Sequence, residues 1–217
     1  FDIKPRAIVC DMHPDYMSTS YATERSEAEG IPLIQVQHHH AHMAACMADN
    51  GIDRPVIGLI WDGTGYGTDG SIWGGECFIG DFEGFERFGS ILPIPLIGGD
   101  RAAKELERTG FALLDAAGLE TGHIKNAPMY KTMLEKGFNC PLSSGMGRLF
   151  DGVSAILGIK AKASYEGQGA VLLEAAATEA GGFYPFELSG APLRFDWREM
   201  IRAMVKERDE DIPRGEI

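Results

Sequence analysis

The sequence lacks the features that mark several large classes of protein. Its four cysteines, Cys10, Cys46, Cys77 and Cys140, form no Cys-x-x-Cys pair, so neither a zinc knuckle nor a dithiol redox site is indicated. No apolar run approaches the roughly 20 residues that a membrane-spanning helix needs, and no secretory signal is present. We therefore expect a cytoplasmic protein with reduced thiols and no membrane partner.

Positive charge is scarce as well. The sequence has 20 Lys and Arg against 32 Asp and Glu, which gives a net charge of −12. A nucleic-acid partner is disfavoured, because nothing forms a basic stripe that could neutralise a run of phosphates. A small anionic ligand remains open, since backbone N–H groups at glycine loops and helix starts hold phosphate without Lys or Arg.

Strand and helix patterns alternate at the start of the chain and predict an α/β layer fold. From residue 56 onward, turn-separated strands predict an antiparallel meander, and a mainly helical region follows. We place a domain boundary here, which gives residues 1–55 and 56–217. The expected strands cover residues 7–11, 32–37, 56–60, 72–79, 85–92, 183–188 and 193–195. The expected helices cover residues 18–29, 38–49, 100–117, 129–136, 147–158, 167–181 and 197–208.

The most specific feature is the histidine cluster Gln37-His38-His39-His40-Ala41-His42. On a helix, His38 and His42 project from one face at the spacing that lets two imidazoles bind the same metal ion. His39 and His40 point elsewhere, and we expect them to support the site or to face solvent. A solvated helix start is the alternative, but the apolar strand–helix junction around the cluster favours a metal site.

A third ligand is expected, because two histidines seldom suffice and a carboxylate is the usual addition in Zn and Fe sites. Our candidate is Asp62, at the end of a predicted buried strand, where α/β folds tend to present functional side chains. The alternative is a turn residue that stabilises the Asp-Gly pair. Two histidines and one carboxylate suit both Zn and Fe(II), so the metal stays open. Nothing in the sequence selects a catalytic base.

Glycine-rich segments at predicted junctions favour a nucleotide cleft. Residues 62–70 form a loop whose backbone N–H groups can contact phosphate. Residues 144–148 lead into a helix, and Asp151 in its expected first turn could accept hydrogen bonds from ribose hydroxyls. Residues 165–169 open another helix; each segment could also be an ordinary turn or cap. The candidate nucleotide-binding residues are Gly63, Thr64, Gly65, Gly145, Gly147, Arg148, Asp151, Tyr165, Glu166, Gly167 and Gln168.

Together these segments resemble the HypF-type carbamoyltransferases, which act in making the cyanide ligands of nickel–iron hydrogenases. The resemblance spans nearly the whole chain in the family's order. It is carried by Cys10-Asp-Met-His-Pro-Asp-Tyr16, Val36-Gln-His-His-His-Ala-His42, Trp61-Asp-Gly-Thr-Gly-Tyr-Gly67, Trp73-Gly-Gly-Glu76, Gly145-Met-Gly-Arg-Leu-Phe-Asp151 and Tyr165-Glu-Gly-Gln168. It implies an actin/Hsp70/sugar-kinase-like fold with ribonuclease-H-like lobes. This chain would hold the end of the first lobe and a second lobe with a helical insertion, truncated at its C-terminus.

The resemblance also implies a reaction. Carbamoyl-adenylate, made with ATP, would bind with Fe or Zn near its phosphate or carbamoyl oxygens, and His38, His42 and Asp62 would hold the metal. The carbamoyl group would pass to the C-terminal cysteine of the partner protein HypE, and AMP would leave. Other domains of the parent chain would be further partners. The chain starts at Phe1 without Met, lacks several family segments and departs from the usual form at residues 98–105. We therefore expect a piece of a longer protein, inactive in isolation.

Alternative functions lie within and outside this superfamily. The same core is similar to antibiotic O-carbamoyltransferases and to the TsaD-like tRNA threonylcarbamoyl transferases. The acidic charge argues against tRNA, and the His-His-His-Ala-His form argues for the HypF type. Two alternatives belong to other functional classes. One is a non-catalytic module that binds HypE or a sister domain, and the other is a plain metallohydrolase.

Overall fold

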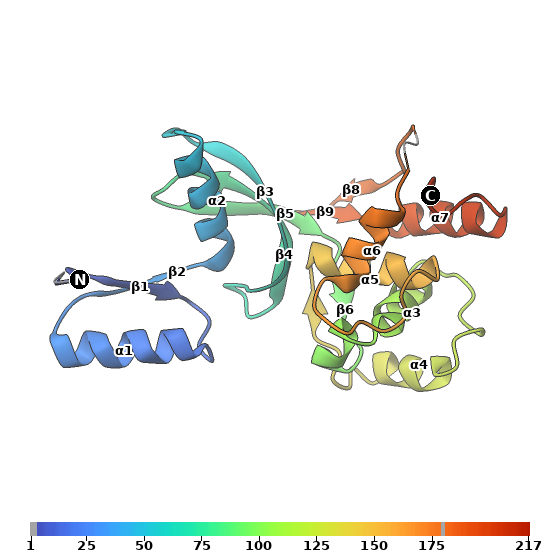
Figure 1. Ribbon diagram of the computed structural model, residues 1–217, viewed down its shortest axis with the longest axis horizontal. Helices are drawn as coiled ribbons and strands as arrows, with labels where there is room; N and C mark the ends of the chain where they lie inside the picture. The colour runs from blue at the N-terminus through green and yellow to red at the C-terminus, as the bar shows by residue number, and fades with distance from the viewer. Residues whose placement is uncertain (1–3, 179–180) are drawn as a thin grey trace.

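The first four elements alternate strand and helix, as the sequence predicts (Figure 1). The structure, a computed structural model, describes residues 4–178 and 181–217. β1 (Ile8–Asp11) and β2 (Leu33–Val36) form a parallel two-stranded sheet, connected by α1 (Met17–Glu29). Gly30 ends α1 at φ 66°, a left-handed conformation that costs glycine little. α2 (His38–Asp49) follows β2 after a single residue, so the histidine cluster forms the first turns of a helix.

The second part of the chain is built on a seven-stranded sheet. Its strands are β3 (Val56–Tyr66), β4 (Ile72–Gly80), β5 (Phe85–Ile91), β6 (Ile94–Pro95), β7 (Leu142–Ser143), β8 (Glu187–Ser189) and β9 (Leu193–Asp196). The order is β6-β7-β4-β5-β9-β8, with β3 also paired to β4. The β3, β4 and β5 pairings are antiparallel, which confirms the predicted meander.

Predicted boundaries are wrong at two strands of this sheet. The strand expected over residues 183–188 is shorter, since β8 covers only Glu187–Ser189. Residues 62–66, expected in a loop, extend β3 to Tyr66. The ladder with β4 shifts register between Trp61 and Gly65, so Asp62 lies in an irregular stretch of strand. Pairing with β4 stops after Trp61 and resumes at Gly65 and Tyr66. Glycines allow the close approach to bulky neighbours here, because a side chain on Gly65 would collide with His39, and one on Gly67, just after β3, with Trp73.

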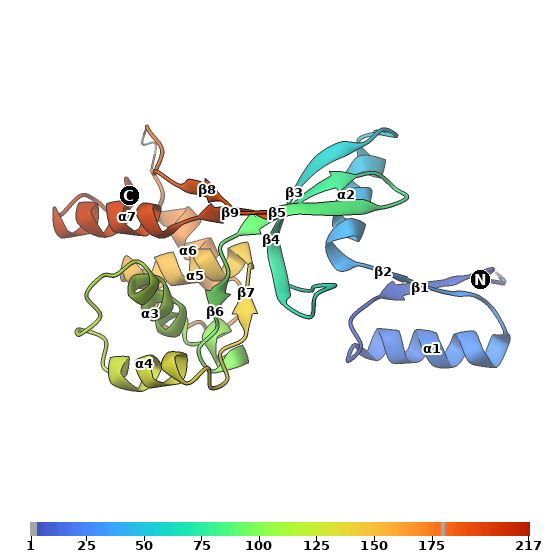
Figure 2. The same ribbon diagram turned by 180° about the vertical axis from the view of Figure 1, so that it is seen from behind.

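Helices cover one end of this sheet, as both views show (Figures 1 and 2). They are η1 (Gly99–Ala103), α3 (Leu106–Ala116), α4 (Ala127–Glu135), α5 (Met146–Ile156), α6 (Gln168–Ala176) and α7 (Arg198–Asp209). The single helix expected over 100–117 is split, because Glu105 takes non-helical angles of φ −100° and ψ 78°. The helix expected over 167–181 ends at Ala176, and residues 179–180 lie outside the described part. Val171 of this helix is 51% exposed.

Two hydrophobic clusters hold these elements together. The larger one joins α3, α4, α5 and α7 to the sheet, and α3 and α5 approach closely where Gly110 lies against Ala155. The smaller one consists of Met43, Met47, Ile60, Trp73 and Phe78, and it packs α2 on β3 and β4. Burying each of these large side chains contributes roughly 1.5–3 kcal/mol. The histidine face of α2 is thereby fixed against the middle of β3. The domain division between residues 55 and 56 stays a prediction.

Among the described residues, no helix combines the length and the apolar character that crossing a bilayer requires.

Candidate functional site

The histidines at the start of α2 are presented by a capped helix. Gln37 is the N-cap, and its side-chain oxygen accepts a hydrogen bond from the backbone N–H of His40 at 2.8 Å. His38 and His42 lie one turn apart with ring centroids separated by 4.7 Å. Their Nε2 atoms are 3.2 Å apart. Two imidazole nitrogens that converge in this way can bind one ion, since metal–nitrogen bonds are about 2.0–2.1 Å long.

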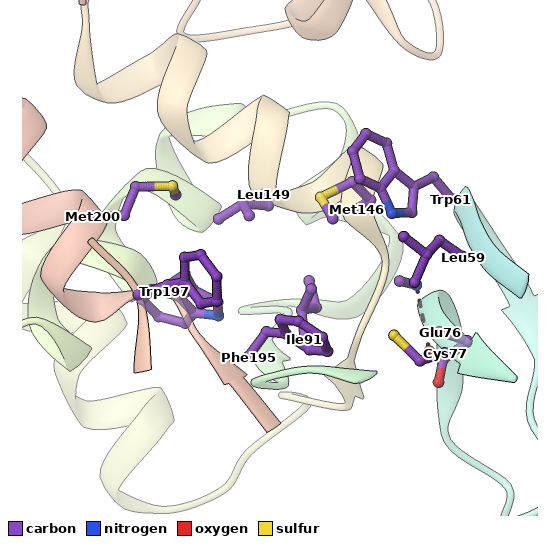
Figure 3. Close-up of a pocket in the computed structure, with 12 residues that line it drawn as sticks. Leu59, Trp61, Glu76, Cys77, Ile91, Met146, Leu149, Phe195, Trp197 and Met200 are labelled. Carbon is purple, nitrogen blue, oxygen red and sulfur yellow. Dashed lines mark hydrogen bonds between the residues drawn. The ribbon is translucent and has the colours of Figure 1, made fainter. Parts of the chain in front are cut away.

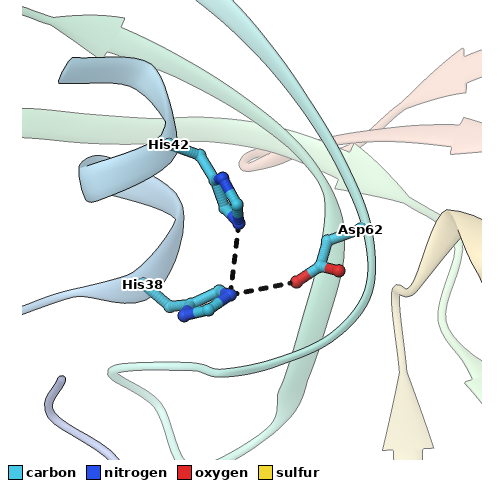
Figure 4. A group of neighbouring side chains, drawn as sticks. All are labelled: His38, His42 and Asp62. Carbon is cyan, nitrogen blue, oxygen red and sulfur yellow. Dashed lines mark hydrogen bonds and ion pairs between the residues drawn. The ribbon is translucent and has the colours of Figure 1, made fainter. Parts of the chain in front are cut away.

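Asp62 completes this group from β3 (Figure 4). Its Oδ2 lies 3.3 Å from His38 Nε2. One ligand atom from each of His38, His42 and Asp62 falls within 4.8 Å of the others. Asp62 Oδ2 is buried and accepts no hydrogen bond from the residues that the structure describes, whereas Oδ1 accepts one from the Gly63 N–H at 2.6 Å. A buried carboxylate oxygen left without a donor fits a metal ligand. The three predicted ligands therefore come together.

The charge state of Asp62 also suits a ligand. Burial acts to raise the pKa of this carboxyl, but the nearby His39 imidazole, the Gly63 N–H and the His38 imidazole outweigh burial. The net result is a pKa below the usual value of 3.8. Asp62 is therefore ionised at neutral pH, as metal binding requires.

Asp11 supports His38 from behind and was missed in the sequence. It ends β1, and its Oδ2 lies 2.7 Å from His38 Nδ1. The other oxygen accepts a hydrogen bond from the His13 N–H at 2.8 Å. A carboxylate on the distal nitrogen of a ligating histidine orients the ring and raises its basicity. The available signal was the same as for Asp62, an acidic residue at the end of a short apolar strand.

The other two helix histidines have different surroundings. His39 is completely buried, with Nδ1 3.3 Å from Gln37 Nε2 and Nε2 3.4 Å from Asp62 Oδ2. His40 is partly buried, and its Nε2 lies 2.7 Å from the backbone oxygen of Asp81. Neither faces open solvent. His39 borders the Asp62 carboxylate and can support the site, whereas His40 is bonded to the Asp81 carbonyl and lies outside the candidate ligand group.

Glycines bring the start of α5 against the Asp62 segment. A side chain on Gly145 would collide with the Gly63 carbonyl, and one on Gly147 would lie 3.0 Å from Gly63 Cα. Among the described residues no side chain caps this helix end. The Gly145 N–H bonds to the Ser143 hydroxyl and the Arg148 N–H to the Gly145 carbonyl, which leaves the N–H groups of Met146 and Gly147 available for an anion near Asp62. The predicted residues Gly63, Gly145 and Gly147 lie together at this junction, whereas Gly65 faces His39.

Glu76 holds this junction in place and was also missed as a site residue. Its buried carboxylate accepts hydrogen bonds from the N–H groups of Gly74 at 3.1 Å and Gly75 at 3.3 Å, and from the Ser144 hydroxyl. Arg87 donates to its other oxygen at 2.6 Å. Because Ser144 directly precedes Gly145, Glu76 ties β4 to the entry of α5.

A cleft of about 760 Å³ is lined by Thr64, which lies two residues after Asp62 in β3. Of the predicted nucleotide-binding residues it gathers Thr64, Tyr165 and Glu166, and it adds Lys104 as a cation. Gln168 lies just behind, where its side-chain oxygen accepts a hydrogen bond from the Ser164 N–H at 2.8 Å. Gly167 caps α6 at φ 77°, a conformation that favours glycine. The cleft is lined by Tyr16, Thr64, Asp100, Ala103, Lys104, Ala163, Ser164, Tyr165 and Glu166.

The positions of Asp151 and Arg148 differ from the prediction that they contact a nucleotide. Asp151 lies in the second turn of α5, not the first, and is only 1% exposed. Its Oδ2 lies 3.2 Å from Arg148 Nη1, and Arg148 is buried as well. Burial raises the pKa of Asp151 to about 6, against the lowering effect of Arg148, and Glu166 adds to the rise. In this conformation neither side chain reaches a ligand in the cleft.

An apolar pocket of about 200 Å³ lies between the sheet and helices α5 and α7 (Figure 3). Aromatic and aliphatic side chains such as Trp61, Met146 and Trp197 surround it. The Glu76 carboxylate also lines it, but its oxygens already accept the hydrogen bonds described above. Apart from the Cys77 thiol, whose pKa is raised by burial, the pocket offers hydrophobic contacts.

Comparison with known proteins identifies the family of this chain. Residues 58–217 match the family description "Carbamoyltransferase, Kae1-like Domain, second subdomain", and residues 1–49 match "HypF Kae1-like domain". The carbamoyltransferase HypF of Rhodobacter capsulatus is 45% identical over 190 residues, which cover 83% of this chain and 26% of that protein. HypF2 of Cupriavidus necator is 45% identical over 186 residues, which cover 83% of this chain and 23% of that protein.

Solved structures agree with the sequence matches. Full-length HypF in its phosphate- and nucleotide-bound form has a TM-score of 0.89 at 32% identity, covering 98% of this chain and 34% of that one. HypF of T. kodakarensis has a TM-score of 0.82 at 30% identity, covering 96% and 30%. The chain thus spans about a quarter of the length of these curated relatives. Its fold is a partial actin/sugar-kinase-like α/β fold, and the chain belongs to the HypF carbamoyltransferase family.

Proposed function

We propose that this chain is the part of a carbamoyltransferase that transfers a carbamoyl group from carbamoyl-adenylate to the C-terminal cysteine of HypE during cyanide-ligand synthesis for nickel–iron hydrogenases. One observation carries the proposal: His38, His42 and Asp62 converge beside the uncapped start of α5. The relatives' names supply the reaction class, carbamoyl transfer. The proposal includes ATP dependence and a cytoplasmic location, where free cysteines stay reduced.

The proposed cofactor is one Fe or Zn ion held by His38, His42 and Asp62. When bound, such an ion acts as a Lewis acid that polarises the carbonyl or phosphoryl oxygen under attack. Residues of this chain orient and charge the proposed ligands. Asp11 orients His38 through Nδ1, and the orphaned Oδ2 of Asp62 supplies negative charge.

The donor nucleotide is proposed to lie in the cleft next to this group. One solved HypF carries phosphate and nucleotide, which supports a nucleotide here. Thr64, Lys104 and Tyr165 line the cleft. The N–H groups of Met146 and Gly147 at the start of α5, which lies against Gly63, are the proposed phosphate contacts. Lys104 supplies a positive charge in a chain that is otherwise strongly acidic.

The transfer itself is an acyl transfer to sulfur. The thiolate of the HypE cysteine attacks the carbamoyl carbon and forms a C–S bond. The C–O bond to the adenylate phosphate breaks, and AMP leaves as the anion. The thiol proton is lost to solvent before attack, because the thiolate is the nucleophile. Since the chain is about a quarter of its relatives' length, we propose that it needs the rest of the parent chain for turnover.

The test uses the longer parent chain with carbamoyl-adenylate and HypE. Mass spectrometry of the HypE C-terminal peptide should detect one added carbamoyl group with the wild type and none with His38→Ala plus His42→Ala. Transfer by the double variant at the wild-type rate would overturn the proposed role of this site. HypE binding that needs neither metal nor nucleotide, without any transfer, would favour a docking module instead.

A further inference from the structure

We propose that the neighbouring residues His38 and His39 are held in opposite tautomers, so that His38 is a metal ligand and His39 is a hydrogen-bond donor that positions Asp62. The inference rests on the proposed metal site and deepens it. It assigns a positioning role to a buried histidine that the metal ligands do not explain. The argument starts from Gln37, whose amide orientation is fixed by its neighbours.

The Gln37 side chain can be oriented without ambiguity. Its Oε1 accepts from the His40 backbone N–H at 2.8 Å. Its Nε2 donates to the Tyr66 carbonyl at 3.1 Å. A flipped amide would place N–H against N–H and oxygen against oxygen, which breaks both bonds. The group that faces His39 Nδ1 at 3.3 Å is therefore an N–H donor.

This donor decides the protonation pattern of His39. A neutral imidazole has one N–H and one bare nitrogen, and an Nδ1 that faces a donor must be the bare one. The proton of His39 then sits on Nε2. That nitrogen lies 3.4 Å from Asp62 Oδ2, and both atoms are buried without a hydrogen-bond partner. Closing the gap by a few tenths of an ångström gives an ordinary N–H···O bond, which spans about 2.7–3.2 Å.

The opposite pattern holds for His38. Its Nδ1 faces the Asp11 carboxylate at 2.7 Å, an acceptor, so Nδ1 carries the proton. Nε2 is then bare and directed at His42 and Asp62, as a metal ligand must be. Neighbouring imidazoles thus receive different roles from the groups behind them. A donor lies behind His39 and an acceptor behind His38.

The two nitrogens of His39 cannot readily exchange their donor and acceptor roles, because neighbouring residues confine the ring. Trp73 stacks beside it with centroids 6.3 Å apart and planes inclined by 28°. Gly65 lies against the ring edge, where any side chain would collide. Asp62 Oδ1 is already bonded to the Gly63 N–H. The His39 N–H is therefore placed to fix the one Asp62 oxygen that remains for the metal.

The tautomers can be read directly from the metal-free chain. Nitrogen-15 NMR of the imidazoles at pH about 8, assigned with His38→Gln and His39→Gln, should give protonated Nδ1 for His38 and protonated Nε2 for His39. A Gln37→Leu variant should weaken the bias at His39, which Asp62 alone would then maintain, and keep the bias at His38 unchanged. A bare Nε2 on His39 in the wild type would overturn the inference, whatever the metal affinity is.

Metal affinity tests the positioning role. Competition titration with Zn²⁺ should give about 10- to 100-fold weaker binding for His39→Leu, the size of effect expected when an outer-sphere partner is lost. His39→Gln keeps an N–H near the Nε2 position and should recover most of the loss. His40→Gln is the matched control on the same helix and should bind as the wild type does.

Three results would separate the claims. Equal Zn²⁺ affinity in the wild type and His39→Leu would overturn the positioning role. Equal weakening in His39→Leu and His39→Gln would overturn it too, because packing and not the N–H would then matter. A wild type that binds no metal in any chain length would overturn the proposed metal site, and the NMR result would still decide the tautomers.

Discussion

His38 Nδ1 lies 2.7 Å from Asp11 Oδ2, although the two residues are 27 positions apart in the chain. The contact links the end of β1 to the first residue of α2. It joins the small parallel sheet to a helix whose other side packs on β3 and β4. His38, a candidate metal ligand, is thus oriented by Asp11 of β1, while its Nε2 faces Asp62 of β3.

The first prediction concerns this contact. Asp11→Leu removes the acceptor at His38 Nδ1 and frees the ring to rotate and to change tautomer. We expect Zn²⁺ affinity to fall about 10- to 100-fold, while the free energy of unfolding of the metal-free chain changes by less than about 1 kcal/mol, because the pair is only partly buried. Asp15→Leu, an exposed acidic residue of the same loop, is the control. Unchanged Zn²⁺ affinity in Asp11→Leu would contradict the role assigned to Asp11.

The second prediction concerns Glu76. Glu76→Leu leaves Arg87 with Asp69 as its remaining ion-pair partner and removes an acceptor from three donors. Breaking a buried ion pair from one side costs about 3 kcal/mol or more. Urea unfolding should report a loss of that size. Arg25→Ala breaks an exposed pair with Glu29 and should cost less than about 1 kcal/mol. Similar losses in the two variants would mean that Glu76 does not organise the junction.

The third prediction concerns the close approach at Gly145. Gly145→Ala places a methyl group against the Gly63 carbonyl and pushes the start of α5 away from the Asp62 segment. Overpacking of this kind costs about 1–3 kcal/mol, and we expect nucleotide affinity in the parent chain to fall with it. Gly122→Ala is the matched control, since nothing lies within 4 Å of its added carbon. Nucleotide affinity that is equal in both variants would contradict a phosphate position at this helix start.

The fourth prediction is a pH dependence at Asp151. Burial is the main cause that raises its pKa from 3.8 to about 6. Because the folded value lies above the unfolded one, the contribution of Asp151 to the free energy of unfolding is fully present below pH about 4 and is lost as the pH rises through about 6. The full effect is about 3 kcal/mol at most.

Carbon-13 NMR of the Asp151 carboxyl carbon measures this value directly. The midpoint should lie near 6, and Asp151→Asn should remove the corresponding slope from the stability profile between pH about 4 and 6. A midpoint near the ordinary value of 3.8 would mean that the Arg148 pair is open to water in solution.

The sequence predicted that His38, His42 and Asp62 would form one group because the signals for them are local. The i,i+4 spacing of His38 and His42 fixes their common face once the helix forms. Asp62 was found because it ends an apolar strand run. The alternation of the first elements and the meander were predicted for the same reason, since periodicity is a property of short windows.

Other features depend on contacts between distant segments and left no local signal. Asp11 reaches His38 only after β1 and β2 pair. Asp151 was expected to face a ribose, but Gly169 brings α6 over its carboxylate and buries it. The extension of β3 through residues 62–66 depends on Gly65 fitting against His39. The sequence does not indicate this contact, because the glycines of this segment are typical of a turn.

The most direct measurement is the metal content of the untagged chain. Elemental analysis after reconstitution with Fe(II) or Zn²⁺ should find about one ion per chain in the wild type and none in His38→Ala plus His42→Ala. His40→Gln should keep the ion, because His40 bonds to the Asp81 carbonyl and lies outside the ligand group. Retention of the ion by the double variant, or its absence from the wild type and from the longer parent chain alike, would contradict a metal centre at His38, His42 and Asp62.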